Sequence, residues 1–139
     1  MKIYLAGPLF SRAEQEYNKG LRDRLESQGH TVFLPQEETA SLVFNGEDWT
    51  ENVFNCDRDG INNSDIVVAI MDGTQVDDGT AWECGYAYAK GKFVLGIRTD
   101  FRNCGDGGDP VNLMLSESSK FVTSNEQVLF DALKRISEG

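Results

Sequence analysis

Short apolar runs alternate with amphipathic stretches along the whole chain. Three of the runs, at 2–6, 31–35 and 93–97, have the length and the bounding residues that are typical of strands. The run DIVVAIMD at 65–72 is almost continuously apolar, as expected of a central parallel strand that is covered on both faces. KFVT at 120–123 is a possible fifth strand.

Helical patterns fill the intervals between these runs. Ser11 and Glu14 have the spacing of a capping box, and a stripe at i, i+4 steps follows until Gly29. Further helices are predicted at about 48–63 and 80–90, around 111–115, and from about 125 onward. The segment 36–47 is predicted to be a loop, and the Gly- and Asp-rich segment 99–110 to be mobile.

Strands that alternate with helices predict right-handed crossovers and a parallel sheet between two helical layers. We therefore expect a flavodoxin-like α/β fold, a three-layer sandwich whose five-stranded sheet has the order 2-1-3-4-5. The length of 139 residues fits a single domain over 1–139.

The net charge of −10 argues against polymeric nucleic acid and anionic membranes as partners, because both would repel the chain. No signal peptide or membrane span is visible in the sequence, so a cytoplasmic location is expected. Three scattered cysteines are expected to be reduced thiols, and a single histidine, His30, leaves too few ligands for a zinc site. The loop AGPLFS matches neither a dinucleotide-binding nor a P-loop motif, so no cofactor is expected.

Acidic residues gather where the strands should end, which is where open α/β sheets bind ligands. Asp57 lies on the helical stripe of Trp49, Val53 and Ile61 that is predicted to face the sheet, although a buried acid can simply bond to a backbone turn. Asp72 ends a strand, where an Asx-turn is the common role, and Asp77 and Asp78 follow in the next loop.

Glu83 allows two interpretations. In the first, Thr80 and Glu83 form a capping box, as their spacing allows, and Glu83 has no role beyond capping the helix. In the first helical turn the helix dipole also favours an ionised carboxylate, which suits a nucleophile that attacks an anomeric carbon. A small-residue ridge of Ala81, Gly85 and Ala89 is predicted to bring this helix close to the sheet. Converging acids indicate glycosidic bond chemistry, with Mg²⁺ binding as the main competitor.

Several segments, taken together in order, resemble one family. IYLAGPLFS with a following AE, LPQ, CDRDGINNSDIVVAIMDG, DDGTAWECGYAYAKGK and PVNLM are similar to successive motifs of the nucleoside 2-deoxyribosyltransferases, along nearly the whole chain. Each motif alone is weak, but the set in this order is specific.

The resemblance implies a flavodoxin-like fold and a double displacement without a cofactor or a metal. Glu83 would form a 2-deoxyribosyl ester and release the base, and a second base, or water more slowly, would then attack with net retention. Tyr4, otherwise a core aromatic, would orient Glu83, while Asp57 and Asp77 would hold the base and handle its proton. Asn112 would reach the sugar of a neighbouring subunit's site, so a homo-oligomer is implied. The remaining residues expected to bind substrate are Gly7, Phe10, Gln36, Gly79 and Met114.

Two alternatives stay open. The same superfamily contains 2-deoxynucleoside 5′-monophosphate N-hydrolases, which need a phosphate site. The apolar loop Pro8-Leu9-Phe10 favours a nucleoside, while Ser11, Arg12 and the SESS run at 116–119 keep the nucleotide possible. A non-catalytic nucleotide-binding module is the alternative from another class, and the joint presence of Tyr4, Asp57, Asp77 and Glu83 argues against it.

Overall fold

Five parallel strands form one sheet in the computed structural model, which describes all 139 residues. Neighbouring strands follow the order β2-β1-β3-β4-β5, so the predicted topology and α/β fold are confirmed. The strands are β1 (Lys2–Ala6), β2 (Thr31–Phe33), β3 (Ile66–Ile70), β4 (Phe93–Ile97) and β5 (Phe121–Thr123).

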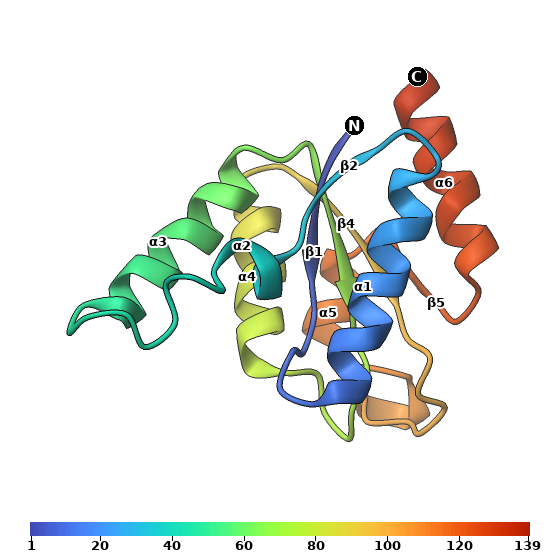
Figure 1. Cartoon of the computed structure of the whole chain (residues 1–139). Coiled ribbons are helices and arrows are strands. Elements are labelled where there is room, and N and C mark those ends of the chain that lie inside the picture. Colours follow the sequence, from blue (N-terminus) through green and yellow to red (C-terminus); the bar gives the residue numbers. More distant parts are fainter.

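Helices cover both faces of the sheet (Figure 1). They are α1 (Arg12–Glu26), α2 (Pro35–Glu38), α3 (Trp49–Asn62), α4 (Asp78–Ala89), α5 (Leu113–Ser118) and α6 (Glu126–Glu138). A single 3₁₀ turn, η1, spans Asp106–Gly108. The predicted capping box at Ser11 and Glu14 is present at the start of α1. None of the helices combines the length and the apolarity that crossing a membrane requires.

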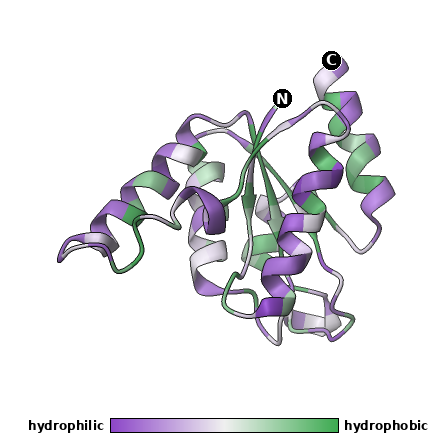
Figure 2. Ribbon diagram, viewed as in Figure 1, coloured by the Kyte–Doolittle hydropathy of each residue, from purple (hydrophilic) through white to green (hydrophobic).

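The alternation of side chains along the strands divides the interior into two cores. Ile3 and Leu5 face α1 and α6, and pack with leucines of those helices such as Leu21 and Leu129. Tyr4 and Ala6 face the other way and pack in a second core with side chains of α3, α4 and α5. Figure 2 shows the consequence, a hydrophobic sheet enclosed by helices with hydrophilic outer surfaces. This alternation decides that Tyr4 points toward α4.

Two predicted helix faces are wrong. In α4 the buried residues are Thr80, Cys84 and Ala87, whereas a Cβ built on Gly85 would meet no atom within 4 Å. Gly85 and Ala89 are exposed and only Ala81 packs against the second core, so the small-residue ridge does not bring the helix onto the sheet. In α3 only the last turn, with Gly60 and Ile61, is buried, because the helix continues beyond the sheet toward its N-terminus (Figure 1). The stripe that begins at Trp49 therefore reaches the sheet only at Ile61.

The first part of the segment predicted to be mobile is held by polar contacts. The buried Arg98 guanidinium donates hydrogen bonds to the carbonyls of Met71, Gly73 (2.9 Å) and Arg102 (2.5 Å). Asp72 accepts hydrogen bonds from the backbone N–H of Thr99 (2.6 Å) and of Asp100 (3.1 Å). Asp72 thus joins the loop after β3 to the loop after β4, which is a structural role.

Candidate active site

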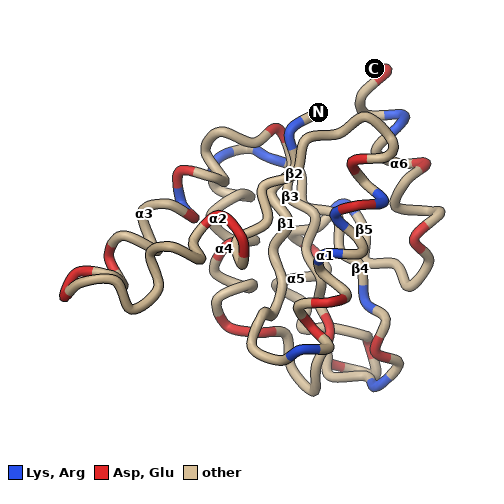
Figure 3. The backbone as a smooth tube through the Cα atoms, in the orientation of Figure 1, with Lys and Arg blue, Asp and Glu red and all other residues tan.

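A cavity of about 800 Å³ opens between α3 and α4 at the carboxyl ends of β1, β2 and β3. Its wall includes the loop after β1 at Gly7 and Phe10, and four carboxylates, namely Asp57, Asp77, Asp78 and Glu83. Figure 3 shows acidic residues in α2, at the start of α4 and in the turn before α3. The cavity lies where parallel α/β sheets bind their ligands, and its polar lining is predominantly acidic.

Tyr4 and Glu83 meet below this cavity. Tyr4 is fully buried on β1, its ring stacks on Phe33 at a centroid distance of 5.2 Å, and its hydroxyl donates a hydrogen bond to Oε2 of Glu83. Burial and the nearby Glu83 carboxylate raise the pKa of Tyr4 far above its ordinary value. The phenol therefore stays protonated and serves as a fixed donor to the carboxylate.

Glu83 does not cap its helix. The N-cap of α4 is Asp77, whose Oδ2 accepts hydrogen bonds from the backbone N–H (2.9 Å) and the hydroxyl (3.1 Å) of Thr80. The predicted capping box at Thr80 and Glu83 is therefore wrong, because the helix begins at Asp78 instead of Thr80. The carboxylate of Glu83 is directed to Tyr4 and the cavity instead.

The environment of Glu83 disfavours its charge. Burial raises the pKa of Glu83 to about 7, and the neighbouring Asp57 and Asp77 carboxylates raise it as well, while the hydrogen bond from Tyr4 lowers it. The expected effect of the helix dipole is thus outweighed by desolvation and like charge. A carboxyl with this pKa changes its protonation state near neutral pH, and such a group in a cleft is a candidate for catalysis.

Asp57 reaches the cavity from α3. Its Oδ1 is buried and has no hydrogen-bond partner, so the carboxyl is not bonded to a backbone turn through that atom. Burial raises the pKa of Asp57 to about 6. A buried polar atom without a partner is uncommon, and here it lies in the wall of a cavity that can hold a ligand. Asp57 can therefore carry a proton in mildly acidic solution and offer it to a bound molecule.

The structure brings together most of the predicted site residues. Gly7, Phe10, Asp57, Asp77, Gly79 and Glu83 line the cavity, and Tyr4 contacts Glu83 from below. At Gly7 an added Cβ would lie 3.0 Å from Cβ of Ile70, so the loop can pass this close to β3 only because this residue is glycine.

Gln36, Asn112 and Met114 lie outside this cavity. Both ends of the Gln36 amide bind α1, because Oε1 accepts from Asn18 (3.0 Å) and Nε2 donates to the carbonyl of Gln15 (3.0 Å). Asn112 and Met114 line a second cavity, of about 760 Å³, which is bounded by α4 and α5. The side chain of Asn112 also caps α5, since its Oδ1 accepts from the backbone N–H of Met114 (2.9 Å).

The site also contains an apolar wall that the sequence analysis did not assign. In addition to Phe10, the cavity wall contains four aromatic side chains, those of Phe44, Trp49, Phe54 and Trp82. Trp82 precedes Glu83, and its ring meets that of Phe54 edge to face at 5.4 Å. Arg58 also lines the cavity. The signal that could have found the wall was the dense run of aromatics around Asp57 and Glu83.

The acidic residues are not arranged for a metal ion. No group of three or more His, Cys, Asp or Glu side chains converges in a way that could hold one. The three cysteines are free thiols, and Nδ1 of His30 lies 3.5 Å from the amino terminus, far from the cavity along β1. The site can therefore offer buried carboxyls, one phenol and an aromatic wall to a ligand.

The sequence matches the model of a known family. Residues 3–114 match the family model described as nucleoside 2-deoxyribosyltransferase. A nucleoside deoxyribosyltransferase of Lactobacillus leichmannii is 36% identical over 66 residues, which are 48% of this chain and 40% of that relative. The chain thus aligns with less than half the length of this curated relative.

Solved structures extend the similarity over nearly all of the chain. A 2-deoxyribosyltransferase from Bacillus psychrosaccharolyticus has a TM-score of 0.79 and 31% identity, covering 93% of this chain and 90% of its own. For a 2-deoxyribosyltransferase from Leishmania mexicana the TM-score is 0.73 and the identity 27%, with 96% and 97% covered. The chain belongs to the nucleoside 2-deoxyribosyltransferase family.

Proposed function

We propose that this protein transfers a 2-deoxyribosyl group from one nucleobase to another, with Glu83 as the nucleophile. The observation that carries the proposal is the pairing of Glu83 with the Tyr4 hydroxyl inside a cavity that also holds Asp57 and Asp77. Glycosyl transfer with retention needs a positioned carboxylate next to the anomeric carbon and a second group that can supply a proton to the leaving group. The cavity provides both.

The first step forms a bond between a carboxylate oxygen of Glu83 and C1′ of the sugar. The bond from C1′ to the base nitrogen breaks, and the base leaves with the electron pair. Asp57, with its raised pKa and an unpartnered oxygen, is suited to give this base a proton. In the second step a nitrogen of another base attacks C1′ and gives its proton to the Asp57 carboxylate, the ester bond breaks, and Glu83 is released as a carboxylate. Two inversions give net retention.

The other cavity residues bind the substrate in this proposal. Asp77 is fixed by its bonds to Thr80 and offers a stationary acceptor to the base or the sugar. Gly7 and Gly79 contribute backbone to the cavity wall, and Phe10, which is 75% exposed, provides an apolar surface for the base at the mouth. Gln36 acts on the base site through Asn18 and α1, since both ends of its amide are bonded there.

The donor is an unphosphorylated 2′-deoxynucleoside. Free N–H groups at a helix start are one kind of site for a 5′-phosphate, but at two of the helix starts beside the cavity, those of α1 and α4, carboxylates accept from these groups. Glu14 accepts from the backbone N–H of Phe10 (3.0 Å) and Ser11 (2.8 Å) at α1. Asp77 and Asp78 accept from the N–H of Thr80 (2.9 Å) and Gly79 (2.8 Å) at α4. A dianion would meet negative charge at both places.

A second subunit completes the site. Asn112 and Met114 line a cavity on the α5 side of α4, and Asp78 lies in the wall of both this cavity and the acidic one. Met114 is 71% exposed and Tyr88, in the same wall, is 62% exposed, so this face has apolar side chains available for a partner. A homo-oligomer in which Asn112 reaches the neighbouring sugar uses this face.

The test is a product analysis with a trapping step. The protein is incubated with a 2′-deoxynucleoside or with its 5′-monophosphate, each with and without a second free base, and the products are separated by chromatography. We expect a new nucleoside only when both the nucleoside and the second base are present. Release of free base and 2-deoxyribose 5-phosphate from the monophosphate, without a second base, would favour the N-hydrolase. No cleavage of either donor would favour a binding module.

The trapping step uses a 2-deoxy-2-fluoro donor, whose fluorine slows the decay of the ester. Intact-protein mass spectrometry after a rapid quench should show one added sugar, in the peptide that contains Glu83. The Glu83→Gln variant is the control and should gain no mass. Turnover without any trapped sugar on Glu83 would contradict the covalent route.

A further inference from the structure

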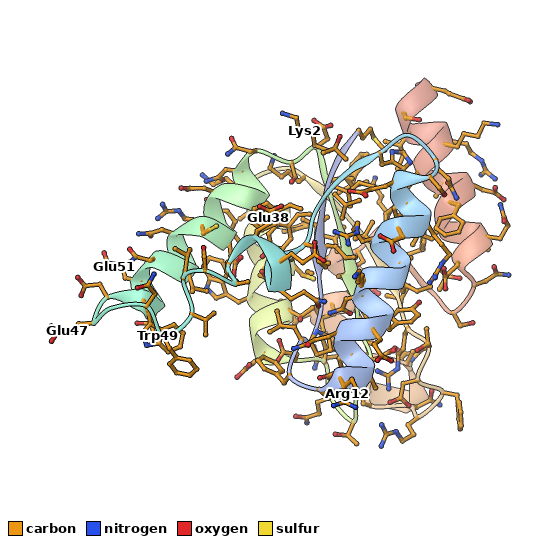
Figure 4. All side chains as sticks on the ribbon, viewed as in Figure 1. Lys2, Arg12, Glu38, Glu47, Trp49 and Glu51 are labelled. Carbon is orange, nitrogen blue, oxygen red and sulfur yellow. The ribbon has the colours of Figure 1, made fainter.

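The cavity continues beyond the carboxylates along α3. Trp49 and Asp57 lie on one face of this helix, and eight residues separate them by about 12 Å along its axis. Both residues line the same cavity. Figure 4 shows Trp49 at the end of α3 that extends away from the sheet. In the proposed function the base lies between Glu83 and Asp57. An unsubstituted base in this position does not fill the outer part of the cavity near Trp49.

The outer part is apolar and open. We name it the outer chamber; its walls are Val43, Phe44, Trp49, Val53 and Phe54. Phe44 is 81% exposed, Phe54 46% and Val43 41%. Large apolar side chains that gather on one exposed concave surface indicate a binding surface, because scattered residues of this kind would not share a cavity.

Two polar side chains beside the outer chamber make hydrogen bonds within the protein. The Thr39 hydroxyl donates to the carbonyl of Pro35 (2.7 Å). The Arg58 guanidinium donates to the Asp59 carboxylate (3.1 Å) and lies over the Phe54 ring at 5.8 Å. Apart from the indole N–H of Trp49, the five wall residues of the outer chamber present only apolar side chains. The chamber therefore suits a predominantly apolar occupant, because a polar one would lose most of its hydrogen bonds to water there.

Phe44 is held in place at the edge of this chamber. Its φ is +56°, an unusual backbone conformation for a bulky residue, and its ring packs on Trp49 at a centroid distance of 4.7 Å. A strained residue that persists on the surface is a reason to look for a role in binding. Here the strained backbone of Phe44 places an exposed aromatic ring against Trp49, at the outer end of the cavity.

We propose that the outer chamber binds an apolar group, aryl or alkyl, attached to the edge of the nucleobase that lies away from the sugar. The inference rests on the proposed function, because it takes the base to lie between Glu83 and the chamber. The chamber and the carboxylates form one continuous cavity, so an occupant of the chamber can be part of the molecule that reacts. The substrate class is thus nucleobases with an apolar substituent on the exocyclic amine, together with their 2′-deoxynucleosides.

The experiment compares matched acceptor bases with one 2′-deoxynucleoside donor. The pairs are adenine with N6-benzyladenine, and cytosine with N4-benzylcytosine, so that a purine or a pyrimidine preference does not decide the result. For the wild type we expect kcat/KM with the better benzyl base to equal or exceed that with its parent. In Phe44→Ala this ratio should fall about tenfold, as the loss of an apolar contact surface implies. Phe101→Ala, at an exposed position outside both cavities, is the matched control and should keep the ratio.

Two results would overturn the proposal. In the first, the wild type uses the parent bases but rejects both benzyl bases. In the second, Phe44→Ala slows the parent and benzyl bases equally and also changes the sedimentation of the protein, which would make this surface a contact between subunits.

Calorimetric titration with the same free bases separates this proposal from the proposed function. If no base is transferred at all, the proposed function fails, and binding still decides the inference. A benzyl base that binds about tenfold more tightly than its parent, with the difference lost in Phe44→Ala, supports the chamber. Equal binding of parent and benzyl bases overturns it.

Discussion

The hydroxyl of Tyr4 donates a hydrogen bond to Oε2 of Glu83 and so joins β1 to α4 across 79 positions of the sequence. Tyr4 is buried beneath the cavity, and its phenol cannot ionise near neutral pH because burial and Glu83 raise its pKa far above the ordinary value. The hydrogen bond opposes the effects of burial, Asp57 and Asp77 on the pKa of Glu83. Tyr4 therefore helps to set the pH at which Glu83 becomes an anion.

Tyr4→Phe should move the acidic limb of the activity profile to higher pH. The substitution removes the hydrogen bond that lowers the pKa of Glu83, so the pKa rises above about 7 and fewer molecules carry the anion at neutral pH. We expect kcat/KM to fall by about tenfold or more at pH 7 and to recover partly at pH 9. The measurement is kcat/KM between pH 5 and pH 9.

Tyr17→Phe is the matched control for this prediction. The Tyr17 hydroxyl also bonds to a carboxylate, that of Glu126 (3.3 Å), but it lies in the layer of α1 and α6. Its removal should leave the pH profile unchanged. An unshifted limb in Tyr4→Phe would show that the hydrogen bond does not govern the ionisation of Glu83.

Glu83→Gln should stabilise the fold in alkaline solution. The folded protein holds the proton of Glu83 up to a pKa of about 7, whereas an unfolded chain releases it near the ordinary value of 4.5. The folded state thus binds more protons between these values, so the wild type loses stability as the pH rises through this interval. The variant has no such loss, and its advantage should grow by an amount on the order of 3 kcal/mol between pH 4.5 and pH 8.

Urea unfolding at several pH values measures this difference. Asp57 is present in both proteins, and its own raised pKa gives a similar trend in each, so the comparison isolates Glu83. Activity should be lost in the variant at every pH, because Gln cannot supply the attacking oxyanion. A variant that is uniformly less stable than the wild type would mean that burial does not disfavour the charge of Glu83.

The sequence predicts the fold more completely than the site, and α4 shows why. Most helix and strand bounds follow from local periodicity, which reports the side that each residue turns toward the core. The layers and the strand order come from the alternation of strands and helices, which is typical of a flavodoxin-like sheet. The spacing of Thr80 and Glu83 predicted a helix that begins at Thr80, whereas the structure caps α4 with Asp77. Only the packing of β1 against α4 shows that Glu83 is directed to Tyr4.

The apolar wall of the cavity was not predicted for a related reason. Periodicity placed Trp49 and Val53 on the face of α3 that also carries Asp57, and it assumed that the sheet lies opposite this face. In the structure α3 extends past the sheet, so the same side chains line a cavity. The position of a helix along its own axis is a tertiary property, and no local pattern of residues records it.

Activity should survive removal of metal ions. The proposed steps use carboxyls alone, and no group of three or more potential ligands converges in the site. We expect the rate of base exchange in excess EDTA to stay within the error of the untreated protein. A complete loss that added Mg²⁺ restores would instead assign Asp57 and Asp77 to a metal ion.

Asp77→Asn should widen the range of donors. Asn caps a helix as well as Asp does, so α4 should begin at the same place while one negative charge leaves the cavity. The ratio of 5′-monophosphate cleavage to nucleoside cleavage should rise by about tenfold, because the phosphate meets less repulsion. The measurement is kcat/KM for both donors, with circular dichroism as the control for the helix. An unchanged ratio would show that the charge of Asp77 does not determine which donor is used.

The contribution of Asn112 to a neighbouring site can be tested by mixing two inactive variants. One is Asn112→Ser, which shortens the side chain but keeps an oxygen that can cap α5, and the other is Glu83→Gln. In a mixed dimer one site combines the intact Glu83 of the first subunit with the intact Asn112 of the second. Equal mixing should therefore restore roughly a quarter of the wild-type activity, since about half of the dimers are mixed and each has one complete site.

The two variants are unfolded together and refolded, so that their subunits exchange, and each refolded alone is the control. Sedimentation then gives the assembly state of every sample. If Asn112 acts within its own subunit, the mixture has no more activity than the average of its components, since every Glu83 that remains is in a chain without Asn112. Restored activity in a dimeric fraction would place the two residues of one site on different chains.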